Sequence, residues 1–261
     1  MSFSENIIEC SNVTHGFSGR RVLWDVSLRV SASERVALVG PSGCGKSTLL
    51  NLISGLFQPE SGKLKKTVPS EKISFVFQEP SLLPWKTVGA NVSLFVDMLD
   101  NTSKGLRKST NDETACDEER FKSLLEQVNL WEWRNSYPDE LSGGMKMRAA
   151  LARALYTSPK LLLLDEPFAA LDDITRESLQ DELIHLSRSN QMAVVLVTHN
   201  IEEAVLLSDK IIVFANSGSI LQEIDVNSDF GTDAVRRNSP KILQIKSLVH
   251  SLWKDNGRGA I

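Results

Sequence analysis

Residues 40–48 combine the residue types and spacing that phosphate binding requires. They read Gly-Pro-Ser-Gly-Cys-Gly-Lys-Ser-Thr, which matches the phosphate-loop pattern G-x-x-x-x-G-K-[ST]. Glycines let successive backbone N–H groups point at phosphates, and the helix expected after the loop adds the positive end of its dipole. We expect Lys46 to reach the β- and γ-phosphates of a nucleotide and the Ser47 hydroxyl to bind Mg²⁺. The candidate nucleotide ligands are Gly40, Pro41, Ser42, Gly43, Cys44, Gly45, Lys46, Ser47 and Thr48.

Two carboxylates follow the apolar run Leu161–Leu164. Unpaired charge at the end of a buried strand is costly, so Asp165 and Glu166 need partners. We expect Asp165 to hold the Mg²⁺ shell and Glu166 to polarise the water that attacks the γ-phosphate. The structural alternative is a carboxylate pair that only favours a helix N-terminus beside Pro167.

His199 stands at the end of another apolar run, Ala193–Thr198. An isolated histidine is more often a packed or surface residue than a catalytic one. Ligands of open α/β sheets gather outside the carboxyl ends of the strands, which is where Gly40 and Asp165 are also expected. There, His199 would hydrogen-bond the γ-phosphate and hold the attacking water.

The elements that must position these residues alternate between strands and helices, which predicts an α/β fold. The short apolar runs typical of a buried, mostly parallel sheet are Arg35–Val39, Ile73–Phe77, Leu161–Leu164, Ala193–Thr198 and Ile211–Phe214. Two earlier strands, Asn6–Val13 and Val26–Val30, are joined by a turn around Gly16–Gly19. Helical spacing of leucines predicts a helix over Lys46–Ser54 that stops at Gly55, and another after Asp173.

Residues 88–155 interrupt this alternation, because they contain no convincing strand and carry an amphipathic helix around Phe121–Val128. We interpret them as a helical subdomain inserted into a core of residues 1–87 and 156–225. The polar segment Asn101–Glu119 has almost nothing to bury, which predicts a surface loop. Residues 226–261 form the expected C-terminal helical tail, in which Ile245, Leu248, Val249 and Leu252 are spaced to dock a helix on the body.

The composition fits a soluble globular protein that is 41% hydrophobic and 24% charged. A net charge of −4 argues against a nucleic-acid partner. No apolar run approaches the ~18–20 residues that span a bilayer, and the N-terminus lacks the features of a secretory signal. The three scattered cysteines favour reduced, cytosolic thiols over a disulfide framework. Any membrane association is therefore expected to come through a partner.

The segment Leu141–Met145, which reads Leu-Ser-Gly-Gly-Met shortly before Asp165, is a narrower pattern than the phosphate loop. It resembles the signature of ABC (ATP-binding cassette) transporter ATPases, and the likeness extends from about Ile7 to Phe214. In that family the signature binds the γ-phosphate of a nucleotide held by the opposite subunit. The resemblance therefore adds Ser142, Gly143 and Gly144 to the candidate ATP ligands.

The same resemblance implies further roles. Gln78 matches a glutamine that touches the metal and the water, so it becomes a candidate catalytic and metal-binding residue. Phe17 falls where the family stacks an aromatic ring on adenine, and the alternative is an aromatic core residue. Ala169–Asp172 is similar to the D-loop, which crosses the dimer interface. The chain departs from the family at Met145 and Met147, where glutamine is frequent, and at Phe17, where tyrosine is frequent; none of these changes removes a phosphate-binding group.

The fold that the resemblance implies is a P-loop NTPase core of the ABC-ATPase type, with an N-terminal antiparallel β subdomain and the inserted α-helical subdomain. ATP and Mg²⁺ are the implied cofactors. The implied partners are a second copy in an ATP-dependent head-to-tail dimer, transmembrane permease subunits and, indirectly, a solute-binding protein. The implied location is the cytoplasmic face of the cell membrane.

A finer likeness involves Gln78–Trp85, which reads Gln-Glu-Pro-Ser-Leu-Leu-Pro-Trp, together with the methionine-ended signature. This combination resembles the ATPases of nitrate, sulfonate and taurine importers. Trp85 would lie at a groove that receives the permease, or it would be a buried packing residue. Two other functions stay open: an ABC-type ATPase that is not coupled to transport, and a P-loop kinase that acts on a small molecule.

Overall fold

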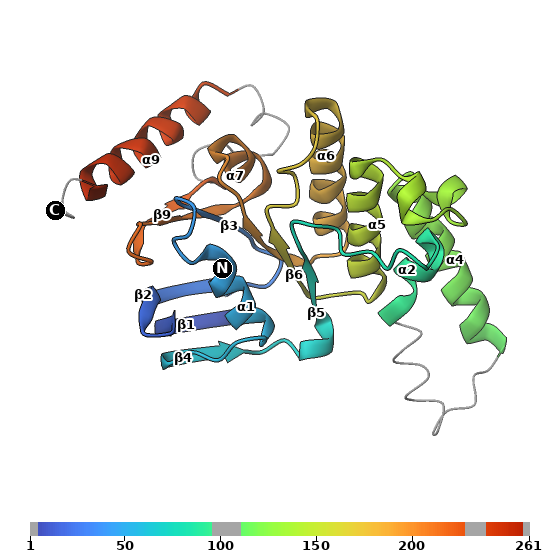
Figure 1. Cartoon of the computed structure of the whole chain (residues 1–261), viewed down its shortest axis with the longest axis horizontal. Coiled ribbons are helices and arrows are strands. Elements are labelled where there is room, and N and C mark those ends of the chain that lie inside the picture. The colour runs from blue at the N-terminus through green and yellow to red at the C-terminus, as the bar shows by residue number, and fades with distance from the viewer. Residues whose placement is uncertain (1–4, 96–110, 228–238, 258–261) are drawn as a thin grey trace.

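Two sheets organise the chain, which a computed structural model describes over residues 5–95, 111–227 and 239–257 (Figure 1). The larger sheet has six strands in the order β5-β6-β7-β3-β8-β9. Its strands are β3 (Arg35–Val39), β5 (Ile73–Val76), β6 (Leu161–Asp165), β7 (Ala193–Val197), β8 (Lys210–Phe214) and β9 (Ile220–Asp225). The first five run parallel and β9 is antiparallel to β8, so the predicted α/β class is confirmed.

The central strands are almost entirely apolar because they are covered on both faces. Every residue of β3 and β7 is buried, so neither strand alternates between apolar and polar positions. Parallel pairing brings the carboxyl ends of β3, β5, β6 and β7 to one edge of the sheet. The segments that carry the phosphate loop, Gln78, Asp165, Glu166 and His199 meet at this edge.

The second sheet is antiparallel, in the order β2-β1-β4, and consists of β1 (Asn6–Phe17), β2 (Arg20–Ser31) and β4 (Ser61–Lys66). The predicted strands were too short, and the turn is confined to Ser18 and Gly19 because Gly16 still pairs with Arg21. One face of these strands is exposed and polar, which shortened the apolar runs visible in the sequence. β4 and β9, which lie at sheet edges, were not predicted from the sequence.

Helix α1 (Lys46–Ser54) has the predicted bounds, and Gly55 caps it. Its leucines share a core with residues of both sheets, so the helix lies between them. The other face of the large sheet is covered by α6 (Asp173–Ser189) and α7 (Ile201–Leu207), which follow β6 and β7. Each helix therefore begins near the sheet edge where the preceding strand ends (Figure 1).

Three helices lie beyond the β5–β6 end of the sheet (Figure 1). They are α2 (Val88–Val92), α4 (Asn111–Gln127) and α5 (Gly143–Tyr156). Two short 3₁₀ turns, Trp131–Trp133 and Pro138–Glu140, separate α4 from α5. A third 3₁₀ turn, Ser70–Lys72, lies outside this region and precedes β5. As predicted, the described residues between 88 and 155 contain no strand.

One expectation for this region was wrong. Residues 111–119, predicted as part of a surface loop, belong to α4, whereas residues 101–110 lie outside the described part of the chain. The segment contains three glutamates and an alanine, which favour a helix. Burial of Leu124, Leu125 and Val128 anchors the same helix further along.

The C-terminal helix α9 (Lys241–Gly257) docks on the body as predicted. Ile245 and Val249 are buried against α7 and β8, and the Trp253 indole N–H donates to the Phe214 carbonyl at 3.0 Å. Leu248, expected to face inward, is exposed. In the described part of the chain, no helix has the length and apolar character to cross a membrane.

Candidate nucleotide site at the edge of the parallel sheet

The loop between β3 and α1 is built on tight backbone geometry. Gly45 caps α1 with a φ of 98°, and a Cβ atom placed there would lie 2.6 Å from Cδ2 of Leu23. Only glycine tolerates both the left-handed conformation and this close approach. No side chain caps the start of α1, so its first N–H groups can bind an anion.

Lys46 is held inside this loop. Its ammonium group donates to the carbonyl oxygens of Gly40 at 2.8 Å and Pro41 at 2.9 Å, and the residue is 5% exposed. Cys44 Sγ lies 3.7 Å from the same nitrogen, and burial raises the pKa of the thiol even though Lys46 opposes this shift. Cys44 is therefore a protonated lining residue, and Lys46 has neutral carbonyl partners that phosphate oxygens can replace.

Ser47 and Asp165 meet across two elements. The Ser47 hydroxyl donates to Asp165 Oδ1 at 2.9 Å, which joins the start of α1 to the end of β6. Burial raises the pKa of the Asp165 carboxyl and the charge of Glu166 raises it further, while the Ser47 hydrogen bond and Lys46 lower it. Binding a cation would relieve the cost of holding this carboxylate in a partly desolvated place.

These oxygen atoms fit Mg²⁺. Hydroxyl and carboxylate oxygens are hard ligands, and Mg²⁺ is usually held by one or two protein groups together with phosphates and water. Among the described residues, no three His, Cys, Asp or Glu side chains converge on one point, so a closed protein cage is not present there. Gln78 lies at the same sheet edge, two residues beyond the last residue of β5, and its exposed side chain has no described hydrogen bond.

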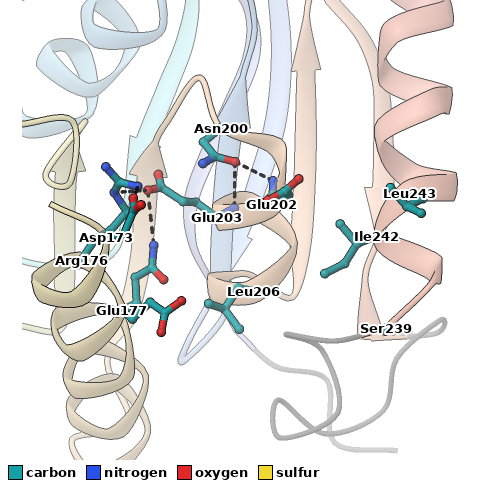
Figure 2. A pocket seen from close by; sticks show the side chains of 11 residues that line it. Asp173, Arg176, Glu177, Asn200, Glu202, Glu203, Leu206, Ser239, Ile242 and Leu243 are labelled. Atoms are coloured by element: carbon teal, nitrogen blue, oxygen red, sulfur yellow. Dashed lines mark hydrogen bonds and ion pairs between the residues drawn. The ribbon is translucent and has the colours of Figure 1, made fainter. Parts of the chain in front are cut away.

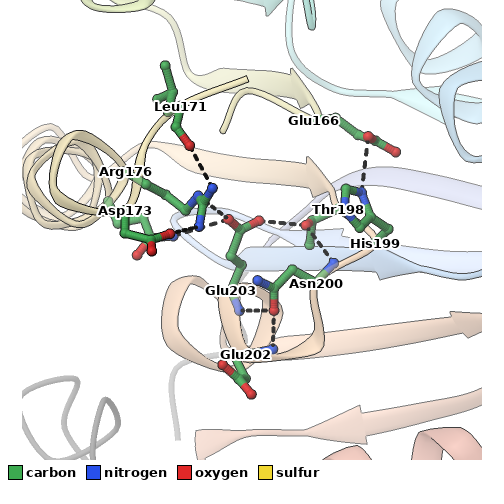
Figure 3. A network of polar contacts seen from close by, with 10 residues as sticks. Glu166, Leu171, Asp173, Arg176, Thr198, His199, Asn200, Glu202 and Glu203 are labelled. Carbon is green, nitrogen blue, oxygen red and sulfur yellow. Dashed lines mark hydrogen bonds and ion pairs between the residues drawn. The ribbon is translucent and has the colours of Figure 1, made fainter. Parts of the chain in front are cut away.

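Glu166 and His199 are in direct contact. His199 Nδ1 lies 3.2 Å from Glu166 Oε2, and the Glu166 N–H donates to the Val197 carbonyl at 3.0 Å (Figure 3). Glu166 adopts a φ of 46°, a left-handed conformation that is costly for a residue with a side chain. With this backbone conformation, the carboxylate that follows β6 contacts His199, which lies two residues beyond the end of β7.

The signature segment is separate from this cluster. Ser142 caps α5 by accepting from the Met145 N–H at 3.3 Å, and both Ser142 and Gly143 are exposed. Gly144 is buried, and a Cβ atom placed on it would lie 2.2 Å from Cγ2 of Thr175. None of the described hydrogen bonds joins this segment to the phosphate loop, so one chain does not bring the two together.

Phe17 presents one side of its ring to solvent. It is 46% exposed, and its ring packs edge-on against His15 at 5.0 Å and Phe57 at 5.5 Å between centroids. The alternative of a core aromatic residue is therefore wrong for Phe17. The buried-packing alternative for Trp85 is also wrong, because that side chain is 71% exposed.

Sequence reasoning missed two buried residues that join parts of the site. The Arg153 guanidinium, on α5, donates to the carbonyl oxygens of Ser81 at 2.9 Å and Pro80 at 3.0 Å, which ties the segment after Gln78 to the signature helix. Glu203, on α7, is 8% exposed and accepts from Thr198. A charged residue within the apolar pattern of each helix was the available signal.

Comparisons with known proteins identify the family of this chain. The ABC transporter family profile matches residues 23–169. The aliphatic sulfonates import ATP-binding protein SsuB 2 of Pseudomonas syringae pv. tomato is 39% identical, over 88% of this chain and 91% of that protein. The nitrate transport protein NasD of Klebsiella oxytoca is 40% identical, over 85% and 86% of the two chains.

A solved structure gives the same result. The ATP-binding cassette MJ0796, in a dimeric post-hydrolysis state bound to ADP and Pi, superposes with a TM-score of 0.70. Its sequence is 31% identical, and the match covers 84% of this chain and 98% of that one. With the family profile, the two relatives and this structure in agreement, the chain belongs to the ABC transporter family of ATP-binding proteins.

Proposed function

We propose that this chain is the ATP-hydrolysing subunit of an importer for a small solute such as nitrate, a sulfonate or taurine. The observation that carries the ATPase activity is the Glu166–His199 contact, which lies at the same sheet edge as the Ser47–Asp165 pair. The transport role is supported by relatives whose names describe sulfonate import and nitrate transport.

In the proposed reaction, the N–H groups of residues 40–48 and the Lys46 ammonium hold the phosphates of ATP. Mg²⁺, when bound by Ser47 and Asp165 with Gln78 nearby, would neutralise charge that develops on the phosphates. Glu166 orients the attacking water and accepts its proton. His199 steadies Glu166 through its Nδ1, which leaves Nε2 for a contact with the γ-phosphate. The Phe17 ring stacks on the adenine.

The second nucleotide-binding surface is proposed to come from another copy of the chain. Ser142 and Gly143 are exposed at the start of α5, and α5 extends 14 residues, so its N-terminus carries a substantial dipole. A head-to-tail dimer would place this N-terminus on the γ-phosphate held by the partner's phosphate loop. The dimeric form of the MJ0796 cassette supports this arrangement.

The permease is proposed to dock beside residues 78–85 at the cytoplasmic face of the membrane. Trp85 offers a large apolar surface there, and most of this surface stays exposed in the single chain. Arg153 links the same segment to α5, so a displacement of this segment would also displace the signature helix. A solute-binding protein would act on this subunit only through the permease.

The test is ATP hydrolysis by the chain purified together with its permease subunits in lipid vesicles. We expect turnover that rises when a solute-loaded binding protein is added, and no turnover by a Lys46→Ala control that has lost nucleotide affinity. Phosphate transfer to a small-molecule acceptor would support the kinase alternative, and full activity without any permease would support a free ATPase. Growth of a deletion strain on nitrate or on sulfonates as sole nitrogen or sulfur source then identifies the solute class.

A further inference from the structure

A buried carboxylate next to the candidate site has no place in the mechanism above. Glu203, in the first turn of α7, is 8% exposed, and three side chains converge on it, two of which, Thr198 and Arg176, are seen in Figure 3. The Thr198 hydroxyl donates to its Oε2 at 2.6 Å, the Gln180 amide donates to its Oε1 at 3.3 Å, and Arg176 Nε lies 3.8 Å from Oε1. Burial raises the pKa of Glu203, so keeping its charge here has a cost that a purely structural position could avoid with an apolar residue.

On one side, Glu203 fixes the backbone around His199. The Thr198 hydroxyl that donates to Glu203 also accepts from the Asn200 N–H at 3.0 Å. Thr198 and Asn200 are the two neighbours of His199 in the chain, so this one hydroxyl holds both. The Asn200 side chain in turn accepts from the N–H groups of Glu202 and Glu203 and anchors the start of α7 (Figure 2).

On the other side, Arg176 extends the network to the D-loop segment, residues 169–172. Its guanidinium donates to the Leu171 carbonyl at 2.6 Å and to Asp173 Oδ1 at 2.7 Å while it faces Glu203. The D-loop segment is also bonded to Glu166, because the Ala169 N–H donates to the Glu166 carbonyl at 3.2 Å.

The contacts therefore close a ring. It runs from Glu166 to His199, through Thr198 to Glu203, through Arg176 to Leu171, and along the D-loop segment back to Glu166 (Figure 3). A shift of the D-loop segment cannot occur without moving Arg176 or breaking its bond to Leu171. Because Arg176 and Glu203 bear opposite charges in a partly desolvated place, breaking their contact is expensive.

We propose that Arg176 and Glu203 are positioning residues that link the D-loop segment to His199, so that His199 meets Glu166 only when that segment is in place. The inference depends on the proposed ATPase function. In the proposed dimer, the D-loop segment faces the second copy, and the pair passes the closure of the dimer to the residues that act on water. Neither residue touches the nucleotide.

The test compares Glu203→Gln, Arg176→Gln and the double variant in the full chain with its permease. Glutamine keeps an acceptor for Thr198 but removes the charge that faces Arg176. We expect kcat to fall about ten- to a hundredfold in each single variant, because a misplacement of a catalytic group by about 1 Å can cost about a hundredfold. We expect the KM for ATP and the affinity for trinitrophenyl-ATP to stay within about twofold. The double variant should be no slower than the slower single variant, since both changes break the same link.

The matched control is Glu202→Gln. Glu202 is the neighbour of Glu203 on α7, but it is exposed and pairs with Lys246 of α9 at 2.8 Å. Its kcat should stay within about twofold of the wild type, as expected for a surface ion pair. If Glu203→Gln does not fold, Arg176→Gln alone tests the inference. The Arg176 side chain is 28% exposed, so replacing it disturbs the core less.

Unchanged kcat in both single variants, or a loss of kcat matched by an equal loss of nucleotide affinity, would overturn the inference. If the inference fails in this way, ATP hydrolysis by the wild-type complex and none by Glu166→Gln would show that the proposed function still stands. A wild-type complex with no ATPase activity would instead remove the proposed function, and the inference with it.

Discussion

The sheet edge and the start of α5 carry two halves of one proposed site, and they differ in how far a single chain completes them. At the sheet edge, Ser47 bonds Asp165, Glu166 bonds His199, and Lys46 is bonded inside its own loop. At the start of α5, Ser142 makes only a cap within its own helix, and Gly143 has no atom within 4 Å of where a Cβ would be.

The difference separates what is assembled by folding from what waits for association. Four strand ends and one helix meet at the sheet edge, so its polar groups are held before any ligand arrives. At the α5 N-terminus, Ser142 and Gly143 are exposed to solvent, as expected of a surface that binds an anion brought by another molecule. Variants in the two regions should therefore fail in different ways.

The largest effect is expected for Glu166→Gln at the sheet edge. Removing the proton acceptor should lower kcat by about 10²–10⁴-fold, the range for general acid–base catalysis. ATP binding should remain, because the phosphate loop and Lys46 are untouched. The variant should therefore accumulate as a dimer when ATP is present, which size-exclusion chromatography with light scattering measures. A turnover rate near the wild-type value would reject Glu166 as the base.

The two glycines of the signature should separate folding from association. A methyl group on Gly144 would meet Thr175, so Gly144→Ala should lower the free energy of unfolding by about 1–3 kcal/mol. Thr175→Ser, which removes the colliding Cγ2 atom, should restore most of this loss. A methyl group on Gly143 meets nothing in the described part of the chain, so the unfolding temperature of Gly143→Ala should not fall. Its ATPase activity should fall if a second copy approaches.

Thermal unfolding and ATPase assays on the same preparations decide this point. Full activity in Gly143→Ala would mean that nothing comes close to the start of α5. In that case the contrast between the two regions would not reflect a dimer.

A moderate effect is expected for Phe17→Ala. Loss of a stacking ring is worth about 1–3 kcal/mol per base, so the KM for ATP should rise about 5- to 100-fold with kcat little changed. Phe17→Tyr keeps the ring and serves as the control, with a KM close to that of the wild type. Equal KM values in the alanine and tyrosine variants would place the adenine elsewhere.

The smallest effect concerns the stability of the nucleotide-free protein and its pH dependence. The raised pKa of Asp165 means that folding favours its protonated form, so ionised Asp165 destabilises the fold above that pKa and stability recovers as the pH falls toward it. Asp165→Asn removes this cost. At pH 7 in EDTA, its unfolding temperature should be higher than that of the wild type, by about 2–4 °C for each kcal/mol regained in a chain of this size.

The same variant should lose the stabilisation that Mg²⁺ and ATP give together. An Asp165→Asn protein that unfolds at a lower temperature than the wild type in EDTA would contradict the raised pKa. Differential scanning fluorimetry between pH 5.5 and pH 8 measures both quantities.

Much of the fold could be predicted because buried parallel strands leave a plain signal. The runs around β3, β6, β7 and β8 were found to within one residue at each end, since strands covered on both faces are almost entirely apolar. The half-exposed strands β1 and β2 were cut short, and β4 was missed, because polar residues on one face hide the pattern. The start of α4 was taken for a loop because its residues are almost entirely polar.

By itself, the sequence determined which residues have the chemistry for phosphate binding and on which strand ends they stand, because local spacing fixes both the loop and the helix that follows it. Only the tertiary structure decided which of them meet. The Glu166–His199 contact joins residues 33 apart in the chain, and Arg176 reaches Glu203 from another helix. Such contacts depend on the order of strands in the sheet and the packing of α6 on α7, neither of which is written in the spacing of neighbouring residues.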